Sequence, residues 1–400
     1  MAAQFIGEKM KKTFDVAVIG AGPAGGMAGL QSARNGLNTI ILEEHAAVGE
    51  PVHCGECISD LALKKFGLKV PRSVISLEAK GIRTIFPDGT ARGLREDGYV
   101  LEKHLWEQWI AEQAVGQGAE LKLNSRVTGI KRNGDRWDIG CGTESYQSKV
   151  LIDASGVQSV ASLKLGLNEK RFESVIGIQY EMLDVKNDGW LDFYLWPKLA
   201  PFGYLWLIPK SNGRANVGLV TTEKNKAKTF LDEFIKEPGF AGKKIVKTFG
   251  GLIPSSGPLE KTYSEGLMLI GDAAGFTSPM FEGGSHLGLK SGQFAADVAA
   301  KAVQKNDFSK ETIKEYETLW KKEFPPYEKL FHGKHGFYKF TDEEMNQIAR
   351  ALPKELNNMG AAAKLKVGLN ILASNPKLVR KELFGAFKAF AYSQARFYGW

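Results

Sequence analysis

The sequence predicts an α/β fold with a doubly wound parallel sheet, a second antiparallel sheet and a helical C-terminal region. Three observations lead to this prediction. A glycine-rich turn follows a short apolar strand near the N-terminus, residues 172–222 alternate apolar or aromatic runs with turns, and helical patterning fills the chain from about residue 305. Strands that alternate with helices form parallel sheets, which bind ligands at the carboxyl ends of their strands.

Composition limits the class of protein. At roughly 100–200 residues per domain, 400 residues suggest two or three domains, and 43% hydrophobic with 24% charged residues exclude a disordered chain. Three cysteines, Cys54, Cys57 and Cys141, suit a reducing compartment such as the cytoplasm. We expect no secretory signal in 1–12, which has no apolar run, and no membrane span in 16–33, which contains five glycines and a proline.

The first predicted element is a βαβ unit of about 30 residues. Strand 14–19 leads into Gly20-Ala21-Gly22-Pro23-Ala24-Gly25, a helix to about residue 35 and a strand at 38–42. In this context the glycine pattern indicates dinucleotide binding. Gly20 permits the tight turn, Gly22 lets the backbone approach a pyrophosphate, and Gly25 lets the helix pack closely. The helix N-terminus attracts the phosphates, and Glu43, with Glu44 as the neighbouring candidate, would accept the ribose hydroxyls.

Two later strands end in small residues at the same predicted edge. Strand 149–154 is followed by Ser155-Gly156, and strand 266–270 by Gly271-Asp272. We expect Asp272 to face the cofactor, although its position also suits a helix cap. A helix over 285–304 follows Gly283-Gly284, and its start at Gly284 and Ser285 is a second N-terminus for an anion or a cofactor.

Five segments together resemble a known arrangement. GAGPAG (20–25), VLIDASG (150–156) and LMLIGDAAG (267–275) resemble the FAD-binding signatures of the p-hydroxybenzoate hydroxylase superfamily. PVHCGE (51–56) and GYLWLIPK (203–210) resemble the PxxCGE and YxWxFP motifs of geranylgeranyl reductases. The resemblance covers residues 13–300 well and the last hundred loosely. It departs from the family at Lys103, Ser155 and Ile208, where Arg, Asp and Phe are usual.

The resemblance implies an FAD-dependent oxidoreductase that saturates C=C bonds of geranylgeranyl chains, in archaeal-type ether phospholipid precursors above all. A quinone or chlorophyll prenyl tail is the alternative substrate. Two other classes remain open: a flavin monooxygenase that uses NAD(P)H and O2, and a flavoprotein that carries electrons to a membrane quinone. No second GxGxxG appears in the sequence. The electron donor is therefore either a ferredoxin-like protein or NAD(P)H bound transiently.

The resemblance also implies the site residues. Cys54 is the expected catalytic residue, whose thiol tunes the flavin or protonates the alkene; the alternative is a small residue packed against the flavin. Tyr204, Trp206 and Pro209 are expected at the substrate. The residues expected at FAD are Gly20, Gly22, Pro23, Ala24, Gly25, Glu43, Glu44, Cys54, Gly55, Cys57, Lys103, Val127, Asp272, Gly284 and Ser285. No metal is expected, because the CxxC at 54–57 lacks a second pair of ligands.

The aromatic residues of 172–222 suit an apolar channel for a prenyl chain. Strand-like patterning with heavy aromatic use predicts an antiparallel sheet. Its candidate wall residues are Phe193, Tyr194, Trp196, Tyr204 and Trp206. The alternative is that these side chains pack in the core and at sheet edges. The predicted domains are an FAD-binding domain (13–75, 100–165 and 255–305), a substrate domain (76–99 and 166–254) and a helical region (306–400).

The C-terminal tail is basic and amphipathic. Residues 361–400 carry seven basic residues and one acidic residue, or +6 of the total +8. Apolar residues recur among them: Leu383, Phe384, Phe387, Phe390, Phe397, Tyr398 and Trp400. Basic helices with aromatic residues lie on anionic membranes, so we expect a peripheral protein on the inner face of the cell membrane. The alternative is a tail packed on its own protein. No motif predicts nucleic-acid binding.

Overall fold

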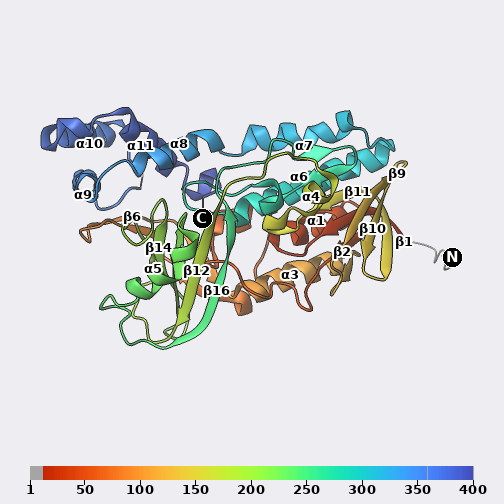
Figure 1. Cartoon of the computed structure of the whole chain (residues 1–400), viewed down its shortest axis with the longest axis horizontal. Coiled ribbons are helices and arrows are strands. Elements are labelled where there is room, and N and C mark those ends of the chain that lie inside the picture. The colour runs from red at the N-terminus through yellow and green to blue at the C-terminus, as the bar shows by residue number, and fades with distance from the viewer. Residues whose placement is uncertain (1–11, 358, 400) are drawn as a thin grey trace.

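The structure is a computed structural model that describes residues 12–357 and 359–399. The described strands form an eight-stranded, a seven-stranded and a three-stranded sheet. Figure 1 shows the first sheet, with β1, β2 and β9–β11, at one end of the long axis and the second, with β12, β14 and β16, toward the other. The C-terminal helices run along one side of both.

The eight-stranded sheet has a parallel centre in the order β18-β11-β1-β2-β8, as the glycine-rich βαβ unit predicts. The hairpin β9–β10 extends it, and β17 adds an antiparallel edge. All four predicted strands lie in this sheet. The strands are β1 (Lys12–Ile19), β2 (Thr39–Leu42), β8 (Glu120–Lys122), β9 (Gly129–Asn133), β10 (Arg136–Cys141), β11 (Glu144–Asp153), β17 (Tyr263–Ser264) and β18 (Leu267–Leu269).

Small residues hold the helices of this domain close together. The helices are α1 (Pro23–Arg34), α3 (Lys103–Gly116), α4 (Val160–Leu165) and α6 (Ser285–Lys305). A Cβ added to Gly292 of α6 would lie 2.5 Å from the Ala24 carbonyl oxygen of α1, and one added to Gly271 would lie 2.8 Å from the Ala24 Cβ. The N-terminal turns of α1 and α6 therefore meet beside the end of β18.

The seven-stranded sheet runs in the order β16-β12-β15-β14-β13-β5-β6. Its strands are β5 (Ile82–Ile85), β6 (Ala91–Leu94), β12 (Ser174–Met182), β13 (Leu191–Tyr194), β14 (Tyr204–Pro209), β15 (Ala215–Thr221) and β16 (Ile245–Pro254), and α5 (Ala227–Phe234) packs on one face. The antiparallel prediction is confirmed for every pair except β13–β5, which is parallel. No hairpin sets the direction there, because β5 reaches the sheet from a distant segment.

A third, three-stranded antiparallel sheet was not expected from the sequence. It consists of β3 (Cys57–Ser59), β7 (Gly98–Leu101) and β4 (Ile75–Ala79), and α2 (Asp60–Lys65) follows β3. This sheet connects the Cys54 loop to the start of α3, because β3 begins at Cys57 and β7 ends two residues before Lys103. It takes strands from two of the predicted domain segments, whose boundaries stay predictions.

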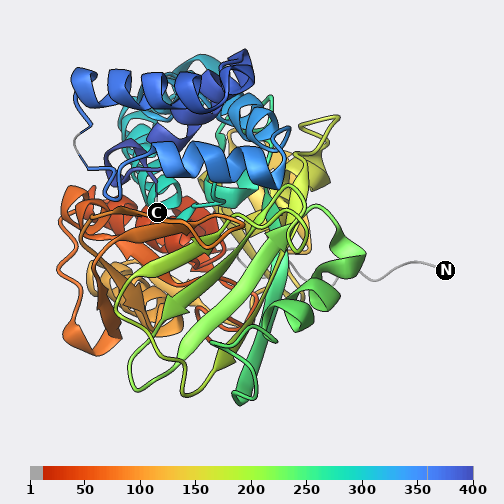
Figure 2. The ribbon, with the colours of Figure 1, turned by 90° about the vertical axis from the view of Figure 1, so that its left-hand side faces the viewer.

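The C-terminal region is helical, as expected, and packs on the protein. Its helices are α7 (Lys310–Glu323), α8 (Tyr327–Phe337), α9 (Asp342–Ala351), α10 (Ala361–Ser374) and α11 (Lys381–Ala391). A Cβ added to Gly333 of α8 would lie 2.5 Å from the Ala389 Cβ of α11, so these two helices are in close contact. Figure 2 shows the C-terminal helices above the second sheet. Within 12–357 and 359–399, no helix is long and apolar enough to cross a membrane.

Three aromatic residues of the tail do not face outward as the membrane hypothesis requires. Tyr398 is buried and its ring lies 4.4 Å from that of His286. Phe390 contacts Phe281 and Phe337, and Phe387 packs against the same apolar cluster. The prediction that these rings face a membrane is wrong, because α11 covers α8 with its apolar face, and Tyr398, which follows α11, packs against His286 and Phe324. Phe384 is exposed, and Trp400 lies outside the described residues.

Candidate active site

A cavity of about 580 Å³ lies between the carboxyl edge of the first sheet and the second sheet. The loops after β1, β2, β11 and β18 line one end of it, and β12, β13, β14 and β16 line the other. Residues 51–57 also line the cavity. Volumes of this size are typical of ligand sites, and the carboxyl edge is where doubly wound sheets bind dinucleotides.

The glycine-rich turn has the geometry that its sequence predicts. Gly20 has φ +91°, and a Cβ there would lie 2.6 Å from the Ala154 carbonyl oxygen, so the turn needs glycine. A Cβ on Gly25 would collide with the Gly20 carbonyl oxygen. A Cβ on Gly22 would meet nothing within 4 Å, and Gly22, Pro23 and Ala24 line the cavity. The backbone at Gly22 is therefore open to a ligand that approaches the first turn of α1.

The two acidic residues after β2 differ in position. The Glu43 carboxylate accepts hydrogen bonds from the Ala21 backbone N–H at 2.8 Å and from the His45 backbone N–H at 3.0 Å, and it pairs with His45 Nδ1 at 2.7 Å. Glu43 therefore fixes the glycine-rich turn, whereas Glu44 and His45 line the cavity. Of the two, only Glu44 lines the cavity.

The loop after β18 brings a buried carboxylate to the same end. Asp272 lines the cavity and accepts a hydrogen bond from Thr277 Oγ1 at 3.2 Å. Burial raises its pKa above the usual value. Gly284 and Ser285 also line the cavity, and α6 begins at Ser285 without a side-chain cap. The free N–H groups of this helix start are thus available beside Asp272, as the sequence predicts.

Besides Gly20, Gly25 and Glu43, two further predicted contact residues lie away from the cavity lining. Val127 is buried in the loop before β9, and Pro209 is the last residue of β14, where Tyr204, Trp206 and Ile208 point to the cavity and Pro209 does not. Side chains alternate between the two faces of a strand, so an odd-numbered position cannot share the face of the even-numbered ones.

Cys54 lines the cavity and stands in the segment before β3. The Glu56 backbone N–H donates to Cys54 Sγ at 3.2 Å, and Gln179 Nε2 donates to the Cys54 carbonyl oxygen at 2.8 Å. Burial raises the pKa of the Cys54 thiol, and it raises that of Cys57 to about 12. Both thiols are free and hold their protons at neutral pH. The described residues contain no group of side chains that could bind a metal ion.

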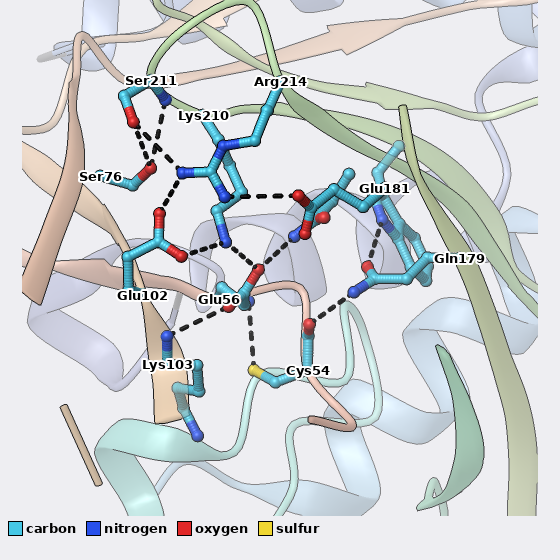
Figure 3. Close-up of polar contacts among 12 residues, drawn as sticks. Cys54, Glu56, Ser76, Glu102, Lys103, Gln179, Glu181, Lys210, Ser211 and Arg214 are labelled. Atoms are coloured by element: carbon cyan, nitrogen blue, oxygen red, sulfur yellow. Dashed lines mark hydrogen bonds and ion pairs between the residues drawn. The ribbon is translucent and has the colours of Figure 1, made fainter. Parts of the chain in front are cut away.

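A buried network of charged residues holds the Cys54 segment (Figure 3). Glu56, at φ +73°, accepts hydrogen bonds from Lys210 Nζ at 2.7 Å, from Asn216 Nδ2 at 2.6 Å and from the Lys103 backbone N–H at 3.1 Å. Lys210 also pairs with Glu102 at 3.0 Å. Removal of one partner from a buried ion pair leaves an uncompensated charge, so this network fixes the loop.

The same network extends to two further residues. Arg214 pairs with Glu102 and, at 3.3 Å, with Glu181 (Figure 3). Burial by itself would raise the pKa of Glu102, but Arg214 and Lys210 lower it to about 2. Lys103 pairs with Glu107 and lines the cavity; burial would lower its pKa, but the Glu107 carboxylate raises it above the usual value. Lys103 is therefore charged at neutral pH where it lines the cavity.

The other end of the cavity is aromatic. Phe193, Tyr204 and Trp206 line it together with Phe281. The Tyr204 ring lies 5.4 Å from that of Phe193 and 5.2 Å from that of Phe281, both edge-on. The Tyr204 hydroxyl donates to the Phe281 carbonyl oxygen at 2.7 Å, and Trp206 Nε1 donates to Gln179 Oε1 at 3.1 Å. Both polar groups are thus satisfied, and the rings present apolar surface.

The remaining two candidate wall residues are on the wrong face. Tyr194 and Trp196 contact each other and Phe234 of α5. They belong to the apolar cluster under α5 and do not line the cavity. Here the alternative, packing in the core, is correct, because Tyr194 follows Phe193 on the same strand and so faces the opposite side of the sheet.

A buried carboxyl interrupts the aromatic wall. Glu282 lines the cavity at φ +47°, and its Oε1 pairs with Lys334 Nζ of α8 at 2.5 Å. Its Oε2 is buried and has no hydrogen-bond partner among the residues that the structure describes. Burial raises the pKa of Glu282. A polar group of the chain therefore faces the apolar end of the cavity.

Several site residues were missed by the sequence reasoning: Glu56, Glu102, Gln179, Lys210, Arg214, Asn216, Glu282 and Lys334. Glu56 and Lys210 end the two quoted motifs, and Arg214 and Asn216 stand in a segment that also fits the family. Their position in or beside these motifs could have identified them as site residues. Nothing in the sequence marks Gln179 of β12 and Glu282 of the loop before α6, which line the cavity, or Lys334 of α8, which pairs with Glu282.

The residues fit FAD. The Gly22 backbone is open to a ligand, the starts of α1 and α6 meet at the cavity, and Glu44 and Asp272 face its interior. The same cavity continues to Cys54 and to the aromatic wall. A dinucleotide in the first end would therefore leave the second end for an apolar substrate.

Comparisons with known proteins agree with this geometry. Residues 15–164 match the family model "FAD dependent oxidoreductase", and residues 173–253 match "Geranylgeranyl reductase catalytic domain". The chain is 36% identical to a digeranylgeranylglycerophospholipid reductase of Methanocaldococcus jannaschii, with 93% of this chain and 98% of that protein covered. It is 32% identical to the enzyme of that name from Methanococcus vannielii, with 94% and 99% covered.

Solved structures add the fold of the whole chain. A geranylgeranyl bacteriochlorophyll reductase-like protein of Thermoplasma acidophilum has a TM-score of 0.84 at 29% identity, over 92% of this chain and all of that one. The flavin-dependent brominase Bmp2 has a TM-score of 0.72 at 19% identity, over 96% of this chain and all of that one, which shows a shared fold. The chain therefore belongs to the geranylgeranyl reductase family of FAD-dependent oxidoreductases.

Proposed function

We propose that the protein reduces the C=C bonds of the geranylgeranyl chains of ether phospholipid precursors. One observation supports this most directly: the glycine-rich turn, Cys54 and the aromatic wall line one and the same cavity. The relatives named digeranylgeranylglycerophospholipid reductase cover almost the whole chain and support the phospholipid as the substrate.

The chemistry divides between cofactor and protein. FAD, when reduced and bound, supplies a hydride. The residues around Gly22 and the starts of α1 and α6 bind and orient its phosphates. Phe193, Tyr204 and Trp206 exclude water from the alkene and position the chain. Cys54 holds a proton on Sγ, because burial raises its pKa, and we assign it the delivery of that proton to the second alkene carbon.

The test is anaerobic incubation of the dithionite-reduced holoprotein with digeranylgeranyl phospholipid, followed by mass spectrometry of the lipid. We expect a gain of two hydrogens for each saturated bond. Unchanged lipid together with oxygen-dependent consumption of NADPH would instead support a monooxygenase. Unchanged lipid with rapid reduction of an added quinone would support an electron carrier. The same assay with a prenylated quinone or chlorophyll precursor tests the alternative substrates.

The electron donor and the place of action belong to the same proposal. We propose a ferredoxin-like protein or NAD(P)H as donor, and a peripheral position at the inner face of the cell membrane, where the lipid substrate is. Stopped-flow measurement of flavin bleaching with each donor separates the two. A donor that bleaches the flavin no faster than buffer is excluded.

A further inference from the structure

The helix α10 (Ala361–Ser374) presents an apolar face that the protein does not cover. Leu365, Leu369 and Leu372 recur at i, i+4 and i+7, which places them on one side of the helix. Their exposed fractions are 66%, 56% and 48%. Single exposed leucines are ordinary on protein surfaces, but three on one helix face form an apolar patch of the kind that marks interaction sites.

The opposite face of α10 is buried in the apolar cluster that also contains the aromatic wall of the cavity. Val367 and Ile371 are buried in the same apolar cluster as Phe193, Tyr204 and Trp206. This cluster is continuous from the aromatic wall to the underside of α10. Figure 1 shows α10 at the outer end of the row of C-terminal helices, away from the first sheet. Whatever contacts the outer face of α10 is therefore on the substrate side of the molecule.

The charges on α10 itself and on the segment that follows it are of one sign. Residues 360–381 contain Lys364, Lys366, Lys377, Arg380 and Lys381 and no acidic residue, although Arg380 pairs with Glu344 of the neighbouring helix α9 at 3.4 Å. Lys364 and Lys366 flank Leu365 and are exposed. An apolar helix face with lysines at its borders and no carboxylates complements an anionic lipid surface. A symmetric contact between two copies would instead place these lysines opposite each other, which opposes self-association through this face.

We propose that α10 docks the protein on the surface of an anionic lipid bilayer, with Leu365, Leu369 and Leu372 inserted among the lipids. The inference rests on the proposed function only for the nature of the surface, since a prenylated phospholipid is the substrate. A helix of 14 residues is too short to span a bilayer, so it lies in the interface. The apolar contact with the membrane is thus assigned to α10 and not to the segment that follows Ser374, whose Lys377 and Lys381 add only charge.

The experiment compares full-length holoprotein with a variant that carries Leu365→Ser and Leu369→Ser. Co-sedimentation uses vesicles of phosphatidylcholine alone or with phosphatidylglycerol, at low and high salt. We expect the wild type to bind the anionic vesicles and to bind less as salt rises. The double variant should lose at least about tenfold in partition coefficient. The matched control is Leu163→Ser, since Leu163 on α4 is equally exposed, at 53%, and should bind as the wild type.

A second variant, Lys364→Glu with Lys366→Glu, tests the charge and keeps the apolar face intact. It should lose the salt-sensitive part of binding. Equal sedimentation of the leucine variant and the wild type would overturn the proposal. So would a wild-type dimer that the leucine substitutions dissociate, because a second copy would then cover α10. Circular dichroism confirms that each variant is folded.

Activity on substrate in detergent micelles separates this proposal from the proposed function. The leucine variant should reduce micellar substrate as fast as the wild type, because α10 only brings the enzyme to a bilayer. Loss of micellar activity in the folded variant would place α10 in the catalytic site and overturn the docking role. If neither the wild type nor any variant reduces micellar substrate, the proposed function is wrong. The vesicle co-sedimentation still tests the membrane docking of α10 in that case.

Discussion

At the scale of single residues, the site depends on groups that are buried and yet polar. Cys54 is held by a backbone N–H on its sulfur and by Gln179 on its carbonyl oxygen, and Glu56 beside it is tied to Lys210 and Asn216. Each of these groups would be costly to bury alone. Their mutual satisfaction fixes a loop whose thiol stays protonated next to the cavity.

If the Cys54 thiol delivers a proton, Cys54→Ala should retain FAD but slow alkene reduction by about 100-fold or more, the usual contribution of general acid catalysis. Single-turnover reduction of the lipid and the flavin absorbance measure the two effects. Because burial raises the thiol pKa above its ordinary value of 9.0, the wild-type rate should not fall as the pH approaches 9. Cys141→Ala is the control, since Cys141 lies in the β10–β11 hairpin outside the cavity. An unchanged rate in Cys54→Ala would show that the thiol delivers no proton and only packs against the flavin.

His286, the second residue of α6, links stability to pH. Its ring is fully buried, and neither nitrogen has a hydrogen-bond partner in the described part of the chain. Burial, with the charges of Lys65 and Lys290, lowers its pKa to about 3. Between the ordinary pKa of 6.5 and about 3 the unfolded chain binds the proton and the folded chain does not, so stability falls as the pH falls through this window.

His286→Phe should therefore flatten the pH dependence of the free energy of unfolding between pH 6.5 and 3, measured by urea titration at several pH values. The control is His332→Phe, since His332 is exposed on α8. This substitution should leave the pH dependence of the free energy of unfolding as it is in the wild type. An equally steep slope in His286→Phe would show that other groups cause the acid sensitivity.

At the scale of elements, side chains alternate between the two faces of β13 and β14, and this decides which aromatic residues reach the cavity. Phe193, Tyr204 and Trp206 face the cavity, and Tyr194 and the nearby Trp196 face α5. The sequence shows that both faces are aromatic. It does not show which of them meets the cofactor domain, because both faces are buried.

Trp206→Ala should weaken prenyl binding more than flavin binding, because it removes wall surface at the apolar end of the cavity. Equilibrium titration with a geranylgeranyl lipid and with FAD gives both affinities. Trp196→Ala is the matched control: it should lower the melting temperature and leave the affinity of the folded protein for the lipid unchanged. Loss of FAD from Trp206→Ala with intact lipid affinity would assign Trp206 to the packing of the flavin domain.

At the scale of the whole molecule, the C-terminal helices complete the cavity from outside. Ser393 and Gly399 line it, Lys334 of α8 pairs with Glu282, and Phe390 of α11 contacts Phe281. The chain after Ser374 is thus part of the folded core, although its composition suits a membrane-binding tail.

A chain that ends at Ser374 should be less stable than the full chain. Fully burying one large apolar side chain contributes about 1.5–3 kcal/mol, and Leu383, Phe390 and Tyr398 are among those lost, so the loss is on the order of 5 kcal/mol. Thermal unfolding followed by circular dichroism measures it, with Phe384→Ser in the full chain as the control for exposed surface, since Phe384 is 57% exposed. If the truncated protein melts at the same temperature as the full chain but no longer binds anionic vesicles, the membrane contact lies in the segment after Ser374.

The sequence by itself determined the cofactor half of this protein. The strand, the glycine turn, the helix and the acidic residue after the second strand are close in the chain, and local backbone geometry requires glycine at positions 20 and 25. The strand ends at Asp272 and Ser155 follow from the same rule for doubly wound sheets. Such local constraints can be recognised in the sequence because they depend on residues that are close together in the chain.

Only the tertiary structure decided the substrate half. It placed Glu282 against Lys334 and joined Glu56 to Lys210 and Asn216, pairs that are far apart in the chain. It turned the tail inward onto α8 and left the leucines of α10 exposed. An amphipathic pattern shows that a helix has an apolar face. It does not show whether that face packs against the protein or against lipid, because this depends on contacts between segments that are distant in the chain.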